Sequence, residues 1–128
     1  MTPLSAPLSL GELIDRLTIL ELKARRIASP TKRAKVRREL AGLREIAKPY
    51  EKLVALIVLK RRLFAVNSVL WTLEEASRQR LRRGPNPPAK AAALLTRIAR
   101  GNDLRHRIKQ RISRLAKGGL VEQKSYYS

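Results

Sequence analysis

Hydrophobic residues recur every three or four positions along most of this chain, and that spacing is the period of an amphipathic α-helix. Ser9 and Glu12 have the spacing of a capping box, in which each side chain bonds the backbone amide of the other residue. The apolar stripe that starts there continues to Ile27. We therefore expect a first helix over residues 9–28.

Two prolines mark the starts of the next two helices. Ser29 is a favoured N-cap and Pro30 suits the first helical position, which together predict a second helix over residues 30–47. Pro49 predicts the start of a third helix, over residues 49–83. The third helix is apolar on two adjacent faces, and this pattern indicates neighbours on two sides.

A proline-rich turn separates the third helix from the fourth. The segment from Gly84 to Pro88 contains three prolines and cannot continue a helix, so a fourth helix is predicted over residues 89–117. Residues 118–128 form a tail with little regular pattern. The predicted fold class is all-α: an antiparallel helical bundle in which the third and fourth helices form a long hairpin and the two shorter N-terminal helices pack along it. The whole chain, 1–128, is expected to be one domain.

The hairpin predicts which residues face each other. If the turn is centred near Asn86, the numbers of facing residues sum to about 172, give or take one helical turn. Trp71 then faces Gly101, where a missing side chain would leave room for the indole. By the same rule Asn67 lies near Asn102 and Arg105.

This register groups several polar residues beside the only Trp of the chain. The group is interpreted either as a recognition pocket or as a buried network that fixes the helix register, as buried Asn does in coiled coils, and the register role is favoured. Its members are Asn67, Trp71, Glu74, Arg78, Asn102, Asp103 and Arg105.

Basic residues outnumber acidic residues by 29 to 10, which leaves a formal net charge of +19. Such a surplus indicates a polyanionic partner, although Arg also occurs on solvated helix faces because it is a good helix former. Both interpretations stay open. The cations expected to contact a polyanion are Lys32, Arg33, Lys35, Arg37, Arg38, Arg80, Arg82, Arg83, Arg107, Lys109, Arg111 and Arg114.

The sequence contains few of the residues that usually serve in catalysis or bind metal ions. The only His, His106, lies between two arginines and lacks partners for catalysis, and the chain has no Cys, so we predict no catalytic residue, no metal site and no cofactor. Five carboxylates could meet inside a bundle and hold a hard cation, but the simpler interpretation pairs Glu74 with Arg78 and Asp103 with a nearby Arg. The five carboxylates are Glu12, Asp15, Glu74, Glu75 and Asp103.

The location of the protein is predicted from what its sequence lacks. The absence of Cys suits a reducing compartment, no secretory signal is visible, and the longest apolar run, Leu53 to Leu59, is too short to span a membrane. We expect a cytoplasmic protein without a transmembrane segment.

Four ordered segments of the chain resemble a small bacterial and phage family that is known as a domain of unknown function. The segment 9–23 is similar to the family's GELIDKITILEIK opening, 66–78 to its VN..LW.IE...R segment, 102–112 to its ND.R...K..I segment, and 120–126 to its closing L.E.KSY. The resemblance spans nearly the whole chain. It implies a small all-helical protein and assigns no activity.

These observations favour a non-enzymatic interaction or scaffold protein that self-associates through leftover apolar faces or binds another protein. The alternative is a polyanion-binding protein whose partner is a nucleic acid or an acidic phospholipid surface. A weaker alternative is a small-ligand binder or an enzyme that uses the group around Asn67 and Trp71. The sequence does not identify the pathway, the partner or the oligomeric state.

Overall fold

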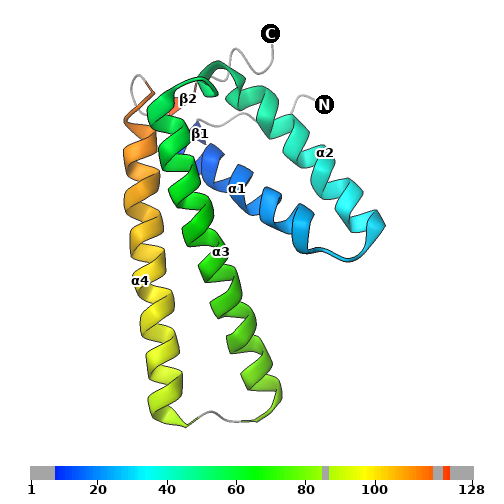
Figure 1. The fold of residues 1–128 in the computed structure, drawn as a ribbon, viewed down its shortest axis with the longest axis vertical. Helices are drawn as coiled ribbons and strands as arrows, with labels where there is room; N and C mark the ends of the chain where they lie inside the picture. The colour runs from blue at the N-terminus through cyan, green and yellow to red at the C-terminus, as the bar shows by residue number, and fades with distance from the viewer. Residues whose placement is uncertain (1–7, 85–86, 117–119, 122–128) are drawn as a thin grey trace, which may run out of the picture.

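The computed structural model describes residues 8–84, 87–116 and 120–121, so most of the predicted tail and the centre of the proline-rich turn lie outside the described residues. The predicted all-α bundle is confirmed (Figure 1). Its four α-helices are α1 (Leu10–Arg26), α2 (Pro30–Ala47), α3 (Val54–Arg82) and α4 (Pro88–Ser113). A 3₁₀ turn, η1 (Lys48–Tyr50), links α2 to α3, and a two-residue strand β1 (Leu8–Ser9) pairs antiparallel with β2 (Leu120–Val121).

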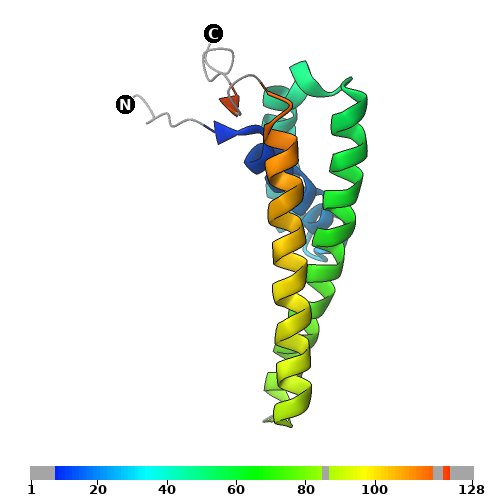
Figure 2. The same cartoon turned by 90° about the vertical axis from the view of Figure 1, so that its left-hand side faces the viewer.

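The predicted hairpin of the third and fourth helices is the longest part of the molecule. Figures 1 and 2 show α3 and α4 side by side along their lengths, and the two helices pack extensively against each other. α1 packs against both of them near the end of the hairpin where α3 begins and α4 ends. α2 packs on α1 rather than along the hairpin, so the prediction that both short helices lie on the hairpin holds for α1 alone.

Ser9 and Ser29 cap the first two helices as predicted, whereas the Glu12 carboxylate of the predicted capping box pairs with Lys109. Ser9 Oγ accepts a hydrogen bond from the Glu12 amide at 3.1 Å, and Ser29 Oγ accepts one from the Lys32 amide at 3.4 Å. α1 ends at Arg26, two residues before the predicted end, and Ile27 is extended. Ser29 precedes Pro30 and therefore disfavours helical geometry, so α1 could not have run on into α2 without a break.

Two other predicted helix ends are wrong because the chain tightens into 3₁₀-type turns. Pro49 lies inside η1 and does not start α3. The amide of Leu53 bonds the carbonyl of Tyr50, which turns the chain before α3 begins at Val54. At the other end, the amide of Leu115 bonds the carbonyl of Ile112, so the α-helical pattern stops at Ser113 and does not reach residue 117.

The hydrophobic core is centred on α1, which contributes more fully buried residues than any other helix. Its apolar stripe packs against the stripes that α3 and α4 turn toward it. The most completely buried side chains are Leu10, Leu13, Ile14, Leu17 and Thr18 of α1, Leu63 of α3 and Ile112 of α4. α1 thus contacts all three of the other helices.

Two glycines let helices approach closely. A Cβ on Gly11 would overlap the backbone carbonyl oxygen of Lys109 and lie 2.7 Å from Ser113 Oγ, to which the Gly11 amide donates a hydrogen bond of 2.9 Å. A Cβ on Gly101 would lie 2.6 Å from Cδ2 of Leu70. The close approach predicted at Gly101 therefore exists, but its partner is Leu70.

The predicted pairing of Trp71 with Gly101 is wrong by one residue. Leu70 belongs to the buried α3 stripe that faces α4, and one residue further along a helix points about 100° away. Trp71 is half-buried, and the guanidinium carbon of Arg26 lies 5.7 Å from its ring centroid. The indole thus lies on the α1 side of α3.

We predict that Gly11→Ala lowers the free energy of unfolding by about 3 kcal/mol, because the methyl group would have to displace the α4 backbone. Gly42→Ala is the matched control, since a Cβ there meets no atom within 4 Å. It should raise stability by up to about 1 kcal/mol through helix propensity alone. Urea unfolding measures the free energy of unfolding of both variants. Equal values for Gly11→Ala and Gly42→Ala would contradict the close approach of α1 to α4.

Candidate functional site

A buried carboxylate organises the polar residues at the centre of the bundle. Asp15 of α1 is 2% exposed and accepts hydrogen bonds from helices on both sides. Asn67 Nδ2 of α3 donates to Asp15 Oδ1 at 3.0 Å, and Arg105 Nε of α4 donates to the same oxygen at 2.9 Å. A second guanidinium nitrogen of Arg105 bonds Oδ2, so the Arg105 contact is bidentate. Three helices therefore meet at one side chain.

Thr18 and Lys109 extend this network. Thr18 Oγ1 donates to the backbone carbonyl of Asp15 at 2.8 Å and accepts from Asn67 Nδ2 at 2.8 Å. Lys109 Nζ lies 3.8 Å from Asp15 Oδ2 and also pairs with Glu12. The network is closed by its own members, which supports the register role predicted for Asn67.

Burial and hydrogen bonding act in opposite directions on the pKa of Asp15. Burial raises this pKa, but the hydrogen bonds from Arg105 and Asn67 and the charges of Arg105 and Lys109 outweigh burial and hold it below its ordinary value of 3.8. The hydrogen bond to Asp15 in turn raises the pKa of Arg105. Both groups are charged at neutral pH.

The buried hydrogen-bond network contains only two of the seven residues predicted to form a group around Trp71. Asn67 and Arg105 meet through Asp15, whereas Trp71 lies beside Arg26. The other members, Glu74, Arg78, Asn102 and Asp103, are exposed, and, after the hydrogen bond to Asp15, the charge of Glu74 contributes to the raised pKa of Arg105. The predicted cluster of Asn67 with Asn102 is therefore wrong, because Asn67 points toward α1 and Asn102 toward solvent.

Sequence reasoning missed the central role of Asp15 and the contribution of Thr18. The signal was present in the spacing of Gly11, Asp15, Thr18 and Leu22, which places four buried residues on one face of α1. Asp15 had been considered only as a metal ligand or a structural ion pair. Across 8–84, 87–116 and 120–121, no group of three or more His, Cys, Asp or Glu is placed to hold a metal ion.

Two of the cations predicted to contact a polyanion are engaged inside the molecule. Lys109 pairs with the carboxylates of Glu12 and Asp15. Arg33 donates from Nη2 to the carbonyl of Ile27 at 2.7 Å and so bonds the chain just beyond the end of α1. The exposed cations that remain are Lys32, Lys35, Arg37 and Arg38 on α2, Arg80, Arg82 and Arg83 at the end of α3, and Arg107, Arg111 and Arg114 at α4.

The arginines along α4 form a longer row than the sequence predicted. We call Arg97, Arg100, Arg107, Arg111 and Arg114 the arginine stripe. Successive spacings of three, seven, four and three residues place all five on one side of the helix, and all are exposed. Arg105 and Lys109, which face α1, lie on another side of α4. The stripe therefore faces away from the core helix.

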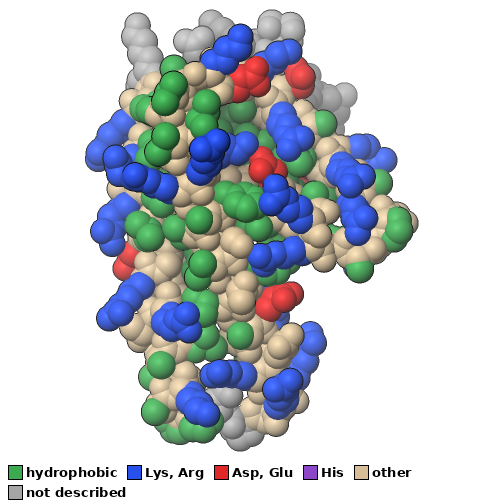
Figure 3. Space-filling view, viewed as in Figure 1, with side chains coloured by type: hydrophobic (Ala, Val, Ile, Leu, Met, Phe, Trp, Pro, Cys, Tyr) green, Lys and Arg blue, Asp and Glu red, His purple; other side chains and the backbone are tan. Residues whose placement is uncertain are grey.

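A groove between the two hairpin helices continues this basic surface onto α3. The groove has a volume of about 380 Å³, and Val58 and Arg62 of α3 line it together with Arg111 and Arg114 of the stripe. In Figure 3, Lys and Arg side chains follow α4 down the left of the molecule, and hydrophobic side chains lie between them and α3. We call this side of α3 and α4, which α1 does not cover, the open face of the hairpin. It combines an apolar centre with a cationic edge.

The arginine stripe has no carboxylate partner among the described residues. Ion pairs within 4.0 Å in that part of the chain involve only four cations, Arg44, Lys60, Arg105 and Lys109. The carboxylates that form them are Glu12, Asp15 and Glu21. The positive charge of the stripe is consequently free to attract an external anion.

None of the helices in the described part of the chain is long and apolar enough to cross a membrane. Comparison with protein-family models, with curated proteins and with solved structures finds no match for this chain. The resemblance to the bacterial and phage family stays a prediction.

We predict that Asp15→Asn lowers the free energy of unfolding by about 2–4 kcal/mol at pH 7, because Arg105 then keeps only a neutral partner. A lowered pKa means that the carboxylate stabilises the fold fully above its unfolded pKa, near 4, and that this contribution is lost as pH falls through the lowered folded value. The difference in the free energy of unfolding between wild type and Asp15→Asn should therefore be smaller at about pH 3 than at pH 7.

Urea unfolding at both pH values measures this difference. The exposed Asp103→Asn is the control and should change stability by less than about 0.5 kcal/mol at either pH. A difference between wild type and Asp15→Asn that is the same at both pH values would show that the Asp15 charge does not stabilise the fold.

Proposed function

We propose that this protein is a non-enzymatic interaction protein that binds nucleic acid, and that the arginine stripe contacts the phosphate backbone. The observation that carries the proposal is the row of five exposed arginines on one side of α4, without carboxylate partners among the described residues. Guanidinium groups suit phosphate because they donate in a planar, bidentate geometry. The partner favoured here is thus a polyanion, which is the first alternative among the three sequence-based hypotheses.

The dimensions of the stripe support backbone contact rather than base reading. The residues from Arg97 to Arg114 span about 25 Å at 1.5 Å per residue, over which a duplex presents many phosphates. Phosphate contacts carry no sequence information by themselves. Trp71, the only Trp, lies on the α1 side of α3 and is not available to stack on bases from the stripe. Binding is expected to be insensitive to sequence and strongly dependent on salt.

Self-association through the open face of the hairpin is disfavoured by charge. Val58, Val69 and Leu104 are exposed apolar residues there, as a self-associating protein would require. Two copies docked through this face would, however, bring their arginines together, and like charges in an interface are costly. A nucleic acid relieves the same repulsion. The proposed partner also fits the cytoplasmic location expected from the sequence.

The group around Asn67 is unsuited to small-ligand binding. Asn67 is 5% exposed and donates to both Asp15 and Thr18. A ligand would have to replace these internal hydrogen bonds, which are costly to break when buried. This arrangement supports a structural role for Asn67 in setting the register of α3 against α1.

We predict that the affinity for a duplex of about 20 base pairs falls linearly with salt on logarithmic axes, with a slope of about −4.5 if the five stripe arginines each neutralise one phosphate. The double variant Arg107→Gln, Arg111→Gln should make the slope less steep by about 2, since each contact contributes about 0.9. Fluorescence anisotropy between about 50 and 200 mM salt measures both slopes.

The matched control is Arg37→Gln, Arg38→Gln, which removes the same charge from exposed positions on α2. Its slope should equal that of wild type. If both double variants reduced the salt slope equally, net charge rather than the arginine stripe would determine binding. Binding to vesicles that contain anionic lipid, without duplex binding, would overturn the nucleic-acid proposal in favour of a membrane surface.

A further inference from the structure

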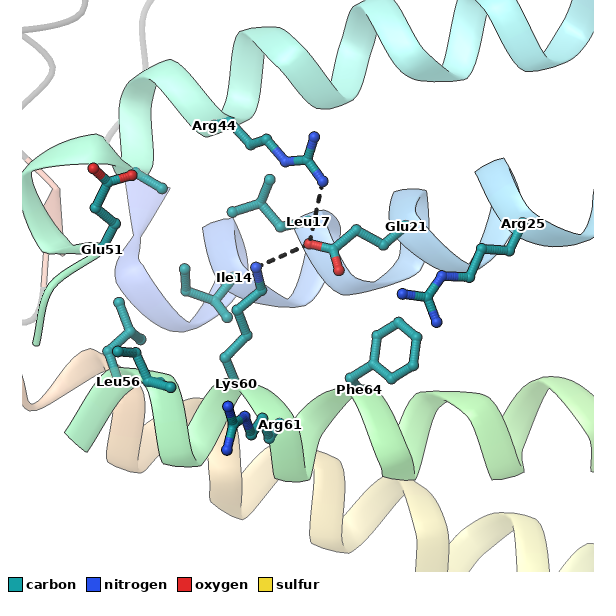
Figure 4. Close-up of a pocket in the computed structure, with 12 residues that line it drawn as sticks. Ile14, Leu17, Glu21, Arg25, Arg44, Glu51, Leu56, Lys60, Arg61 and Phe64 are labelled. Atoms are coloured by element: carbon teal, nitrogen blue, oxygen red, sulfur yellow. Dashed lines mark ion pairs between the residues drawn. The ribbon is translucent and has the colours of Figure 1, made fainter. Parts of the chain in front are cut away.

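A pocket of about 470 Å³ lies on the opposite side of α3 from the arginine stripe, where α1, α2 and α3 come together (Figure 4). It exists because α2 packs on α1 while η1 carries the chain away from α2 before α3 begins. Figure 4 shows α1 between the other two helices, with side chains from all three turned toward the space. Its apolar lining consists of Ile14, Leu17, Ala47, Leu56, Ile57 and Phe64.

Charged residues surround this apolar lining and leave an excess of positive charge. Four cations and two carboxylates line the pocket, which gives a surplus of two positive charges. The cations are Arg25, Arg44, Lys60 and Arg61, and the carboxylates are Glu21 and Glu51. A ligand with a negative group is therefore favoured over a cation.

Glu21 forms an ion pair with Lys60 and still has a buried carboxylate oxygen without a hydrogen bond. Lys60 Nζ lies 2.9 Å from Glu21 Oε1, and Arg44 Nη2 lies 4.0 Å from the same atom. Oε1 is buried, yet neither cation is aligned to donate a hydrogen bond to it. Arg44 keeps 60% of its side chain exposed, so its guanidinium is free to turn toward an anion at the pocket mouth.

Phe64 defines the end of the pocket nearest Arg25. The guanidinium carbon of Arg25 lies 5.0 Å from the centroid of the Phe64 ring, in the geometry of a cation–π contact. The other three cations, Arg44, Lys60 and Arg61, have no aromatic partner among the described residues. The anionic group of a ligand is therefore expected nearer to Arg44 than to Arg25.

We propose that this pocket binds a small amphipathic anion, whose apolar body lies on Ile14, Leu17 and Ile57 and whose phosphate or carboxylate group pairs with Arg44. Its volume is in the range of small-molecule sites, and an apolar lining with a few placed charges is the usual composition of such sites. The proposal is independent of nucleic-acid binding, since the arginine stripe lies on the other side of α3 and offers charge along an open surface.

Isothermal titration of the whole chain with octyl phosphate, below its micelle-forming concentration, tests the proposal. Inorganic phosphate should bind at least about tenfold more weakly, because it cannot fill the apolar lining. Octyltrimethylammonium should also bind at least about tenfold more weakly, because it carries the wrong charge. Equal binding of the cationic and anionic amphiphiles, or no binding of octyl phosphate, would overturn the proposal.

Two pairs of variants locate the ligand. Arg44→Gln should weaken octyl phosphate binding about tenfold, whereas Arg37→Gln, at an exposed α2 position outside the pocket lining, should leave it unchanged. Ile57→Ala should weaken it several-fold, whereas the neighbouring Val58→Ala should not, because Val58 lines the groove on the other side.

The side chains of Ile57 and Val58 are similarly exposed, at 39% and 43%, so neither variant should unfold the protein. Circular dichroism checks that the folds are equal. Loss of octyl phosphate binding in Val58→Ala, or in the arginine-stripe variant Arg107→Gln, Arg111→Gln, would place the ligand on the open face and overturn the pocket site. Unchanged octyl phosphate binding in both Arg44→Gln and Ile57→Ala would also overturn the pocket site.

Discussion

The buried carboxylate of Asp15 fixes the position of α1 between α3 and α4. Removing a carboxylate from water is costly, and the cost is offset only if charged and polar donors converge on it with good geometry. Asn67 and Arg105 supply those donors from the two hairpin helices. Sliding α1 by one turn would separate Asp15 from them and leave a charge without partners. The network therefore favours the register in which Asp15, Asn67 and Arg105 meet.

The position of α1 determines which surfaces of the molecule are left open. Because α1 covers one face of the α3–α4 hairpin, the opposite face keeps the arginine stripe in solvent. Because α2 packs on α1 and not on α3, a space with an apolar lining remains beside Ile57. The two proposed sites thus follow from the same arrangement, although different residues form them and different ligands would occupy them.

Local patterns predicted the helices, whereas contacts between helices required the structure. Ser9 and Ser29 predicted two helix starts, because capping depends on residues only three positions apart. The hairpin rule placed a close contact at Gly101 and erred by one residue, since it fixes the sum of two residue numbers but not the rotation of each helix. Asp15 was not recognised as central, because its partners lie 52 and 90 residues away in the sequence.

The two sides of α4 show why the net charge of this chain could not be interpreted from composition. Arg105 and Lys109 face α1 and are neutralised by carboxylates of that helix. The stripe arginines occur in the same segment and have the same chemistry, but they face solvent. Internal pairing removes equal numbers of positive and negative charges, so the whole surplus of 19 positive charges is left outside these pairs. The surplus is spread over exposed cations of α2, α3 and α4, and the rotation of α4 that seats Arg105 on Asp15 sets the direction in which the arginine stripe points.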